Sequence, residues 1–178
     1  MNLILATYIN VFGIYFTETN NYHKINDIVI KPALITKNIN KINGIIMGYE
    51  TWYTLSPKLK HFSYNIIITE EPELLLKKNN NNVHFTSNME NALKYLKKNN
   101  NIESIYILAN NTILNTILNN NFIRNNIAMI YLYIFKNKYY YKDYYYINMK
   151  QVLKNFIINF KDSYYHNDYL KLKAYNKN

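Results

Sequence analysis

The segment Gly44–Trp52 constrains the fold more than any other part of the chain. A short apolar run, Gly44-Ile45-Ile46-Met47, reaches a glycine at Gly48 and continues with Tyr49-Glu50-Thr51-Trp52. An apolar strand that ends in glycine and opens into a helix is a place where backbone N–H groups can meet a phosphate. The segment therefore predicts a strand–turn–helix unit with an anion-binding turn.

The size and composition of the chain indicate a single folded domain covering residues 1–178. Its 178 residues are 49% hydrophobic, which suffices for one buried core. No apolar stretch reaches about 18 residues, which a membrane-spanning helix would need. The start of the chain lacks a signal-peptide pattern, so we expect Met1–Ala6 to enter a buried strand. These features predict a cytoplasmic monomer without a membrane partner.

Cysteine and histidine content argues against several kinds of site. The absence of cysteine excludes disulfides, zinc–thiolate centres and thiol catalysis. The spacing of the four histidines is unlike that of metal ligands, so no metal site is expected. These residues are His23, His61, His84 and His166.

The net charge of +10 raises the alternative of a nucleic-acid-binding protein. Only one of the 21 basic residues is an arginine, Arg124, and the lysines occur as scattered pairs such as Lys77-Lys78. The abundance of Lys, Asn, Ile and Tyr is what A/T-rich codons produce without selection for binding. We therefore expect no specific nucleic-acid partner.

Apolar strand patterns alternate with helix patterns along most of the chain. Such alternation predicts an α/β fold with a mostly parallel sheet and right-handed crossovers. Residues Lys161–Asp168 read as a hairpin connection, so the C-terminal end should be antiparallel. The expected architecture is a mixed, mostly parallel eight-stranded sheet with about four flanking helices. The strand candidates are Leu3–Tyr8, Gly44–Met47, Asn65–Thr69, Val83–Phe85, Ser104–Leu108, Ala128–Phe135, Val152–Phe160 and Tyr169–Tyr175, and the helix candidates are Ala33–Lys37, Tyr49–Leu55, Met89–Lys98 and Thr112–Leu118.

The Gly48–Trp52 segment, followed by the strand Asn65–Thr69, resembles the cofactor-binding core of dihydrofolate reductases. The resemblance implies hydride transfer from NADPH to dihydrofolate, giving tetrahydrofolate, with Thr51 capping the helix and Trp52 anchoring it in the core. NADH is an alternative cofactor. By this resemblance the substrate contacts are Ile4, Ala6, Asp27, Thr51, Leu55 and Leu108, and the cofactor contacts are Ala6, Gly13, Ile14, Gly48, Tyr49, Glu50, Thr51, Thr69, Ala109, Asn110, Asn111 and Thr112.

The family uses one carboxylate to assist protonation of a ring nitrogen while hydride arrives from the nicotinamide. Asp27 is the candidate for this acid, since it precedes the apolar run Ile28-Val29-Ile30 and Thr36 follows at near the family's distance. Pro32 interrupts the helix that usually carries the acid. An exposed aspartate that caps a helix remains an equal alternative for Asp27, and Glu18 is a second candidate.

Several charged contacts of the family are missing from this chain. Tyr49 and Glu50 stand where a basic residue grips the cofactor phosphate, and Glu70 occupies a second phosphate-contacting position. The family's Gly-Gly pair is Ala109-Asn110 here, and Asn110 can tolerate a left-handed backbone there. Ser63 replaces the arginine that binds the folate carboxylate, for which Lys60 or His61 are substitutes. Tyr133 or Phe135 stands in place of a threonine that bonds the acid.

These losses leave a second hypothesis open. The chain can be a non-catalytic relative with the same fold, kept as a binding or structural module. The tyrosine-rich stretch Tyr139–Tyr146 favours this hypothesis because aromatic residues are enriched at interfaces. A half-buried strand, which also favours tyrosine, explains the stretch equally well.

Overall fold

The computed structural model describes residues 1–10, 14–16, 22–61, 63–75, 82–135, 144–146, 154 and 156–177. It confirms the predicted α/β class, with a mixed sheet and an antiparallel C-terminal hairpin. The chain divides into two compact units: Met1–Leu3 with His23–Leu108, and Ile4–Tyr22 with Ala109–Asn178. The single domain expected for residues 1–178 stays a prediction.

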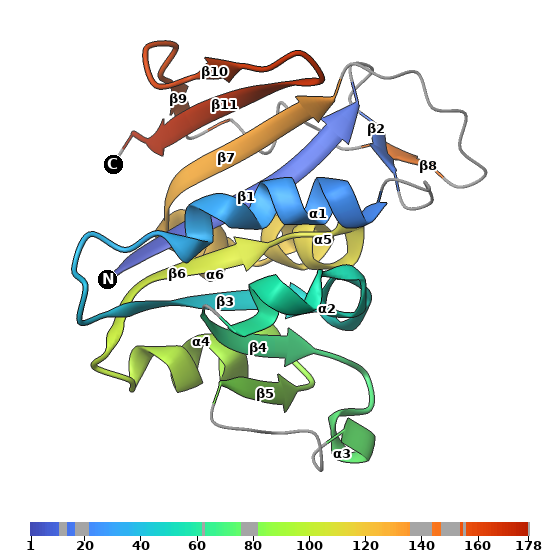
Figure 1. Ribbon diagram of the computed structural model, residues 1–178, viewed down its shortest axis with the longest axis vertical. Coiled ribbons are helices and arrows are strands. Elements are labelled where there is room, and N and C mark those ends of the chain that lie inside the picture. Colours follow the sequence, from blue (N-terminus) through green and yellow to red (C-terminus); the bar gives the residue numbers. More distant parts are fainter. Residues whose placement is uncertain are drawn as a thin grey trace. The chain divides into compact units, whose positions relative to one another are not determined.

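The first unit contains four parallel strands in the order β6-β3-β4-β5 (Figure 1). They are β3 (Ile42–Gly48), β4 (Tyr64–Ile68), β5 (Val83–Thr86) and β6 (Ile102–Leu108). In β3, Ile45, Ile46 and Met47 are each 0% exposed, so both faces of the strand are covered. Burial on both faces explains why these strands read as continuous apolar runs without alternation.

An asparagine or a proline marks the start of three helices of this unit. Asn88 caps α4, because its side chain accepts a hydrogen bond from the N–H of Asn91 at 2.9 Å. Proline opens the short helices η2 and α3, neither of which the sequence analysis anticipated. The elements are α1 (Tyr22–Ile30), η1 (Lys31–Leu34), α2 (Tyr49–Thr54), η2 (Pro57–His61), α3 (Pro72–Leu75) and α4 (Met89–Lys97).

The helix predicted at Ala33–Lys37 is wrong. The helix in this part of the chain is α1, which ends at Ile30, and only a 3₁₀ turn follows it. Pro32 lacks the N–H that would bond the carbonyl of Ile28, and its ring clashes with that carbonyl, so an α-helix cannot continue. By Ile35 the backbone is already extended, with φ −104° and ψ 123°.

Gly44 in β3 allows α4 to approach the sheet closely. A Cβ atom at this position would lie 2.8 and 2.9 Å from the two Cδ atoms of Leu96. Leu96 is 0% exposed, so its side chain has little room to move away. Glycine is therefore required here by packing against the helix.

We expect Gly44→Ala to lower the free energy of unfolding by about 1–3 kcal/mol, the usual cost of overpacking a core. Urea denaturation measures this as a lower midpoint with an unchanged slope. Leu96→Ala, combined with Gly44→Ala, serves as the control because it makes room for the new methyl group. If the two changes destabilise the protein additively, the proposed contact between them is wrong.

The second unit contains the order β10-β11-β7-β1, with β9 paired to β11 as well. The two-residue strand β10 was not predicted and raises the sheet from the expected eight strands to nine. The pair β2–β8 forms a separate two-stranded sheet. The elements are β1 (Asn2–Asn10), β2 (Ile14–Phe16), α5 (Asn111–Asn119), α6 (Asn121–Asn126), β7 (Ile127–Phe135), β8 (Tyr144–Tyr146), β9 (Phe156–Ile158), β10 (Tyr164–Tyr165) and β11 (Tyr169–Asn176).

The strand predicted at Val152–Phe160 is shorter than expected. Residues 152, 153 and 155 lie outside the described part of the chain, and β9 ends at Ile158. The side chain of Asn159 then accepts hydrogen bonds from the N–H groups of Lys161 and Asp162, at 3.0 and 3.4 Å. Such side-chain bonding to the backbone two and three residues on begins a turn and ends the strand.

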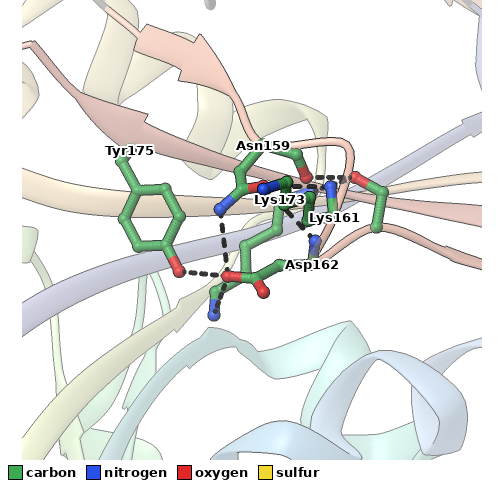
Figure 2. Close-up of polar contacts among 6 residues, drawn as sticks. Asn159, Lys161, Asp162, Lys173 and Tyr175 are labelled. Carbon is green, nitrogen blue, oxygen red and sulfur yellow. Dashed lines mark hydrogen bonds and ion pairs between the residues drawn. The ribbon is translucent and has the colours of Figure 1, made fainter.

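The turn after β9 is closed by a polar cluster around Asp162 (Figure 2). Asp162 Oδ2 accepts hydrogen bonds from the hydroxyl of Tyr175 at 2.8 Å, from Asn159 Nδ2 at 3.2 Å and from Lys173 Nζ at 3.3 Å. The hydrogen bonds from Tyr175 and then Lys173 hold the pKa of Asp162 below its ordinary value. The cluster joins the turn to β11.

We expect the stabilisation from Asp162 to depend on pH. Because the folded-state pKa lies below the ordinary value of 3.8, the carboxylate stabilises the folded chain above that pH. The contribution is lost as the pH falls through the folded-state pKa. Urea denaturation at pH 7 should show Asp162→Asn to be less stable than the parent, and the difference should shrink at pH 3. Glu71→Gln, at an exposed carboxylate, is the control, and an equal difference at both pH values would refute the cluster's role.

Within the described residues, no helix has both the length and the apolar character needed to cross a bilayer.

Candidate functional site

Three predicted site residues of the first unit lie at one edge of its parallel sheet. Gly48 is in register with Ile68, the residue before Thr69, and Met47 is in register with Leu108. Gly48, Thr69 and Leu108 therefore meet at the carboxyl ends of three neighbouring strands. In open α/β sheets this edge is where ligands bind.

Gly48 forms the junction between β3 and α2. Its backbone is extended, with φ −74° and ψ 158°, which any residue can adopt. The backbone conformation therefore does not require glycine at this buried position. A close approach of another group to the backbone would still favour glycine at this position.

The six-residue helix α2 carries three more predicted site residues, and a fourth follows it. The expectation that Thr51 caps the helix is wrong, because Gly48 occupies the N-cap position and no side chain bonds there. Thr51 lies inside the helix and is 4% exposed, Tyr49 is half-buried and Glu50 is exposed. Leu55 follows the helix and is 2% exposed. Thr51 and Leu55 are four positions apart, the spacing of one helical face.

Trp52 differs from its expected role as a core anchor. The side chain is only half-buried, and Lys60 Nζ lies 4.7 Å from the centroid of its ring. This is the geometry of a cation–π contact. Lys60 Nζ also donates to the carbonyl oxygen of Tyr53 at 3.5 Å, and partial burial lowers the pKa of Lys60. Lys60 is thus a basic side chain in contact with α2.

Asp27, the candidate acid, lies on α1 beside the end of α2. Its Oδ1 accepts a hydrogen bond from the N–H of Ser56 at 3.2 Å, and the side chain is half-buried. Asp27 lies in the interior of the helix, so the alternative of a helix cap does not hold. Ser56 directly follows Leu55, so the carboxylate bonds the backbone one residue beyond a predicted substrate contact. The rival candidate Glu18 lies outside the described residues.

Two polar residues that the sequence analysis did not select join the same helices. Asn26 Nδ2 donates a hydrogen bond to Thr54 Oγ1 at 2.8 Å, and Asn26 is 3% exposed. Thr54 Oγ1 in turn lies 3.0 Å from the carbonyl oxygens of Glu50 and Thr51. A buried polar group needs a partner. The signal in the sequence is that Asn26 stands three and four positions before the apolar residues Val29 and Ile30, on the same helical face.

The side chains that replace the family's cations supply no positive charge. Glu50 and Glu70 are both exposed and each lies two residues beyond the aligned pair Gly48 and Ile68. Ser63 is buried, and its hydroxyl donates to Asn65 Oδ1 at 3.1 Å. That bond ties Ser63 to β4, at the position where the family has arginine. These residues therefore offer no positive charge to a 2′-phosphate.

In the second unit, β1 and the start of α5 lie together. Ala6 accepts a hydrogen bond through its carbonyl oxygen from the N–H of Ala109 at 2.9 Å. The buried Thr7 hydroxyl donates to the carbonyl oxygen of Ala109 at 3.0 Å. Ile4, Ala6 and Ala109 are 3%, 1% and 3% exposed, so all three predicted contacts are packed in the core of this unit.

Asn110 begins α5 as its N-cap. Its side chain accepts a hydrogen bond from the N–H of Ile113 at 3.0 Å. Asn110 does not use the left-handed backbone that asparagine can tolerate, since it has φ −76° and ψ 179°. An extended N-cap needs no glycine. Thr112 is exposed on the first turn.

Three of the predicted cofactor contacts lie wholly or partly outside the described part of the chain. Gly13 lies outside the described residues, and only the backbone is described for Asn111 and for Ile14, which pairs with Tyr146. Tyr133 and Phe135, in place of the family's threonine, are 2% and 5% exposed. They are core residues of the second unit.

A tyrosine with a raised pKa lies outside the predicted site residues. The hydrogen bond between the hydroxyls of Tyr64 and Tyr95, which are 3.2 Å apart, and partial burial raise the pKa of Tyr64 to about 12. The Tyr95 ring also stacks on His84 with centroids 4.3 Å apart. These side chains form an aromatic cluster of β4, β5 and α4, remote in sequence from Asp27 and Gly48.

No known protein-family model matches the chain, and a search of curated proteins found none that matches it.

Proposed function

We propose that this protein is a dihydrofolate reductase-like enzyme that reduces dihydrofolate to tetrahydrofolate with NADPH, or with NADH in its place. The observation that carries the proposal is the hydrogen bond between Asp27 Oδ1 and the N–H of Ser56, at 3.2 Å. It links the candidate acid to the end of α2, 29 positions further along the chain. Asp27 is the candidate acid by sequence resemblance alone, and this contact did not enter that assignment.

The mechanism assigns separate roles to the described residues. When bound, the nicotinamide cofactor supplies the hydride. Asp27 assists protonation of the substrate ring, which a half-buried carboxylate beside an apolar contact such as Leu55 is suited to do. Gly48 and Thr69 lie at the carboxyl ends of β3 and β4, where the protein backbone can approach the pyrophosphate of the cofactor.

Lys60 replaces the missing arginine as the contact for the substrate carboxylate. It is held near α2 by the Trp52 ring and the Tyr53 carbonyl oxygen. An ammonium group forms a weaker, less directional contact with a carboxylate than a guanidinium fork does. We therefore expect folate to bind weakly when Lys60 makes this contact.

The alternative function is a non-catalytic module with the same fold. The observation that favours it is the pair of exposed carboxylates Glu50 and Glu70 where the family has cofactor-binding cations. Each lost charge-assisted hydrogen bond costs roughly 1.5–3 kcal/mol, or about 10- to 150-fold in affinity. Losing two such bonds would remove most cofactor affinity.

Equilibrium binding and turnover distinguish the two functions. Purified protein is titrated with NADPH, NADH and a methotrexate-like folate analogue, and oxidation of the cofactor is followed with dihydrofolate present. Binding of a cofactor and the analogue, with turnover, is the expected result. Binding of neither ligand would refute the reductase and support the module. Salt-dependent retention on DNA without either ligand would instead support nucleic-acid binding.

A further inference from the structure

Two adjacent residues of α1 each bond to the end of α2. Asn26 Nδ2 donates to Thr54 Oγ1 at 2.8 Å, and the next residue, Asp27, accepts from the N–H of Ser56 at 3.2 Å. Neighbouring helical residues point about 100° apart, so the two contacts together restrict both rotation and sliding of α1. A single contact would restrict only one of these movements.

The Thr54 hydroxyl is the link between the two helices. It accepts from Asn26 and lies 3.0 Å from the carbonyl oxygens of Glu50 and Thr51, to which its proton can be donated. The N–H of Leu55 in turn donates to the carbonyl oxygens of Thr51 and Trp52, at 3.2 and 3.3 Å. The end of α2 is therefore held in one conformation, and Asn26 bonds to a fixed group.

We propose that Asn26 is a positioning residue that holds the Asp27 carboxylate against Ser56 through its bond to Thr54. Asn26 touches no reacting group, and it acts by fixing the helix that carries the acid. Its burial supports this role, because a 3% exposed amide that lost its partner would draw α1 away from α2 to reach water. The inference rests on the proposed reductase for its catalytic consequence.

The test is Thr54→Val, which removes the hydroxyl but keeps the volume of the side chain. We expect kcat for dihydrofolate reduction to fall about 10- to 100-fold, because small displacements of a catalytic group are costly. Rates are divided by the concentration of sites titrated with the folate analogue, so unfolded protein does not contribute. Amide hydrogen exchange at Ser56 should become faster at the same time.

Two further variants separate positioning from a general loss of stability. Thr54→Ser keeps the hydroxyl and should restore both kcat and the protection of Ser56. Thr116→Val removes a hydroxyl that bonds only its own helix, to the carbonyl oxygen of Thr112 at 3.0 Å, and should change neither. Equal kcat and equal Ser56 exchange in Thr54→Val and the parent would overturn the inference.

Failure of the proposed function has a different signature. If the parent shows no turnover, the reductase is refuted, and Ser56 exchange alone judges the positioning role. Faster exchange in Thr54→Val, restored in Thr54→Ser, would then keep the contact between Asn26 and Thr54 as the support of Asp27. If the parent shows no turnover and exchange at Ser56 is unchanged in Thr54→Val, both the proposed function and the positioning role of Asn26 are refuted.

Discussion

Asp27→Asn is expected to lower kcat for dihydrofolate reduction by about 10²–10⁴-fold at neutral pH, the usual contribution of a general acid. The asparagine side chain keeps a carbonyl oxygen that can accept the hydrogen bond from the N–H of Ser56. In the parent protein this nitrogen lies 3.2 Å from Asp27 Oδ1. The helix contacts should therefore persist, and the loss should report proton transfer and not folding. Steady-state kinetics with NADPH measures the effect.

The dependence on pH makes this test sharper. Without the carboxyl group, the ring must take its proton from solution, so the activity of Asp27→Asn should rise as the pH falls. Asp168→Asn, at an exposed carboxylate on the C-terminal hairpin, provides the control and should leave turnover unchanged. If Asp27→Asn keeps the parent's turnover at low and neutral pH alike, the acid is a different residue.

The second large effect concerns the cofactor. Glu70→Arg should raise the affinity for NADPH relative to NADH by roughly 10- to 100-fold, since it replaces repulsion of a 2′-phosphate with a charge-assisted hydrogen bond. Glu50→Arg should also raise the affinity for NADPH relative to NADH. Glu50 lies two residues beyond Gly48, as Glu70 lies two residues beyond Ile68, and Gly48 and Ile68 are in register. The parent protein should show little preference for NADPH. Fluorescence titration with both cofactors measures the ratio.

A change in net charge alone could also attract a more negative cofactor. Glu90→Arg, at an exposed position in the first turn of α4, changes the net charge by the same amount and serves as the control. The specific effect should weaken as salt is added, since exposed charges are screened. An equal ratio of affinities in Glu70→Arg and Glu90→Arg would show that the edge of β3 and β4 does not contact the 2′-phosphate.

The strands of the first unit were predictable because their burial is written in local sequence. Runs such as Ile45-Ile46-Met47 are covered on both faces, and only a buried parallel strand tolerates so continuous an apolar segment. The caps of α4 and α5 were equally local, since an asparagine before the helix bonds a backbone N–H three residues on. Short-range patterns of this kind need no tertiary information.

The helix α1 could not be predicted in the same way. Its residues Ile25, Ile28, Val29 and Ile30 are β-branched, which favours strand over helix when considered alone. Ile25 and Val29 lie four positions apart and are 4% and 3% exposed, so burial of one helical face outweighs the local preference. The error at Ala33–Lys37 follows from assigning that helix to the far side of Pro32.

The sequence by itself determined the α/β class, the strand that ends at Gly48 and the residue types available for chemistry, because each depends on neighbours within a few positions. Only the tertiary structure decided that Asp27 meets Ser56 and that Asn26 meets Thr54, contacts that span 29 and 28 positions. It also decided that Thr51 is not a cap. The physical reason is that such contacts depend on how helices pack, and packing is set by the burial of many distant side chains at once.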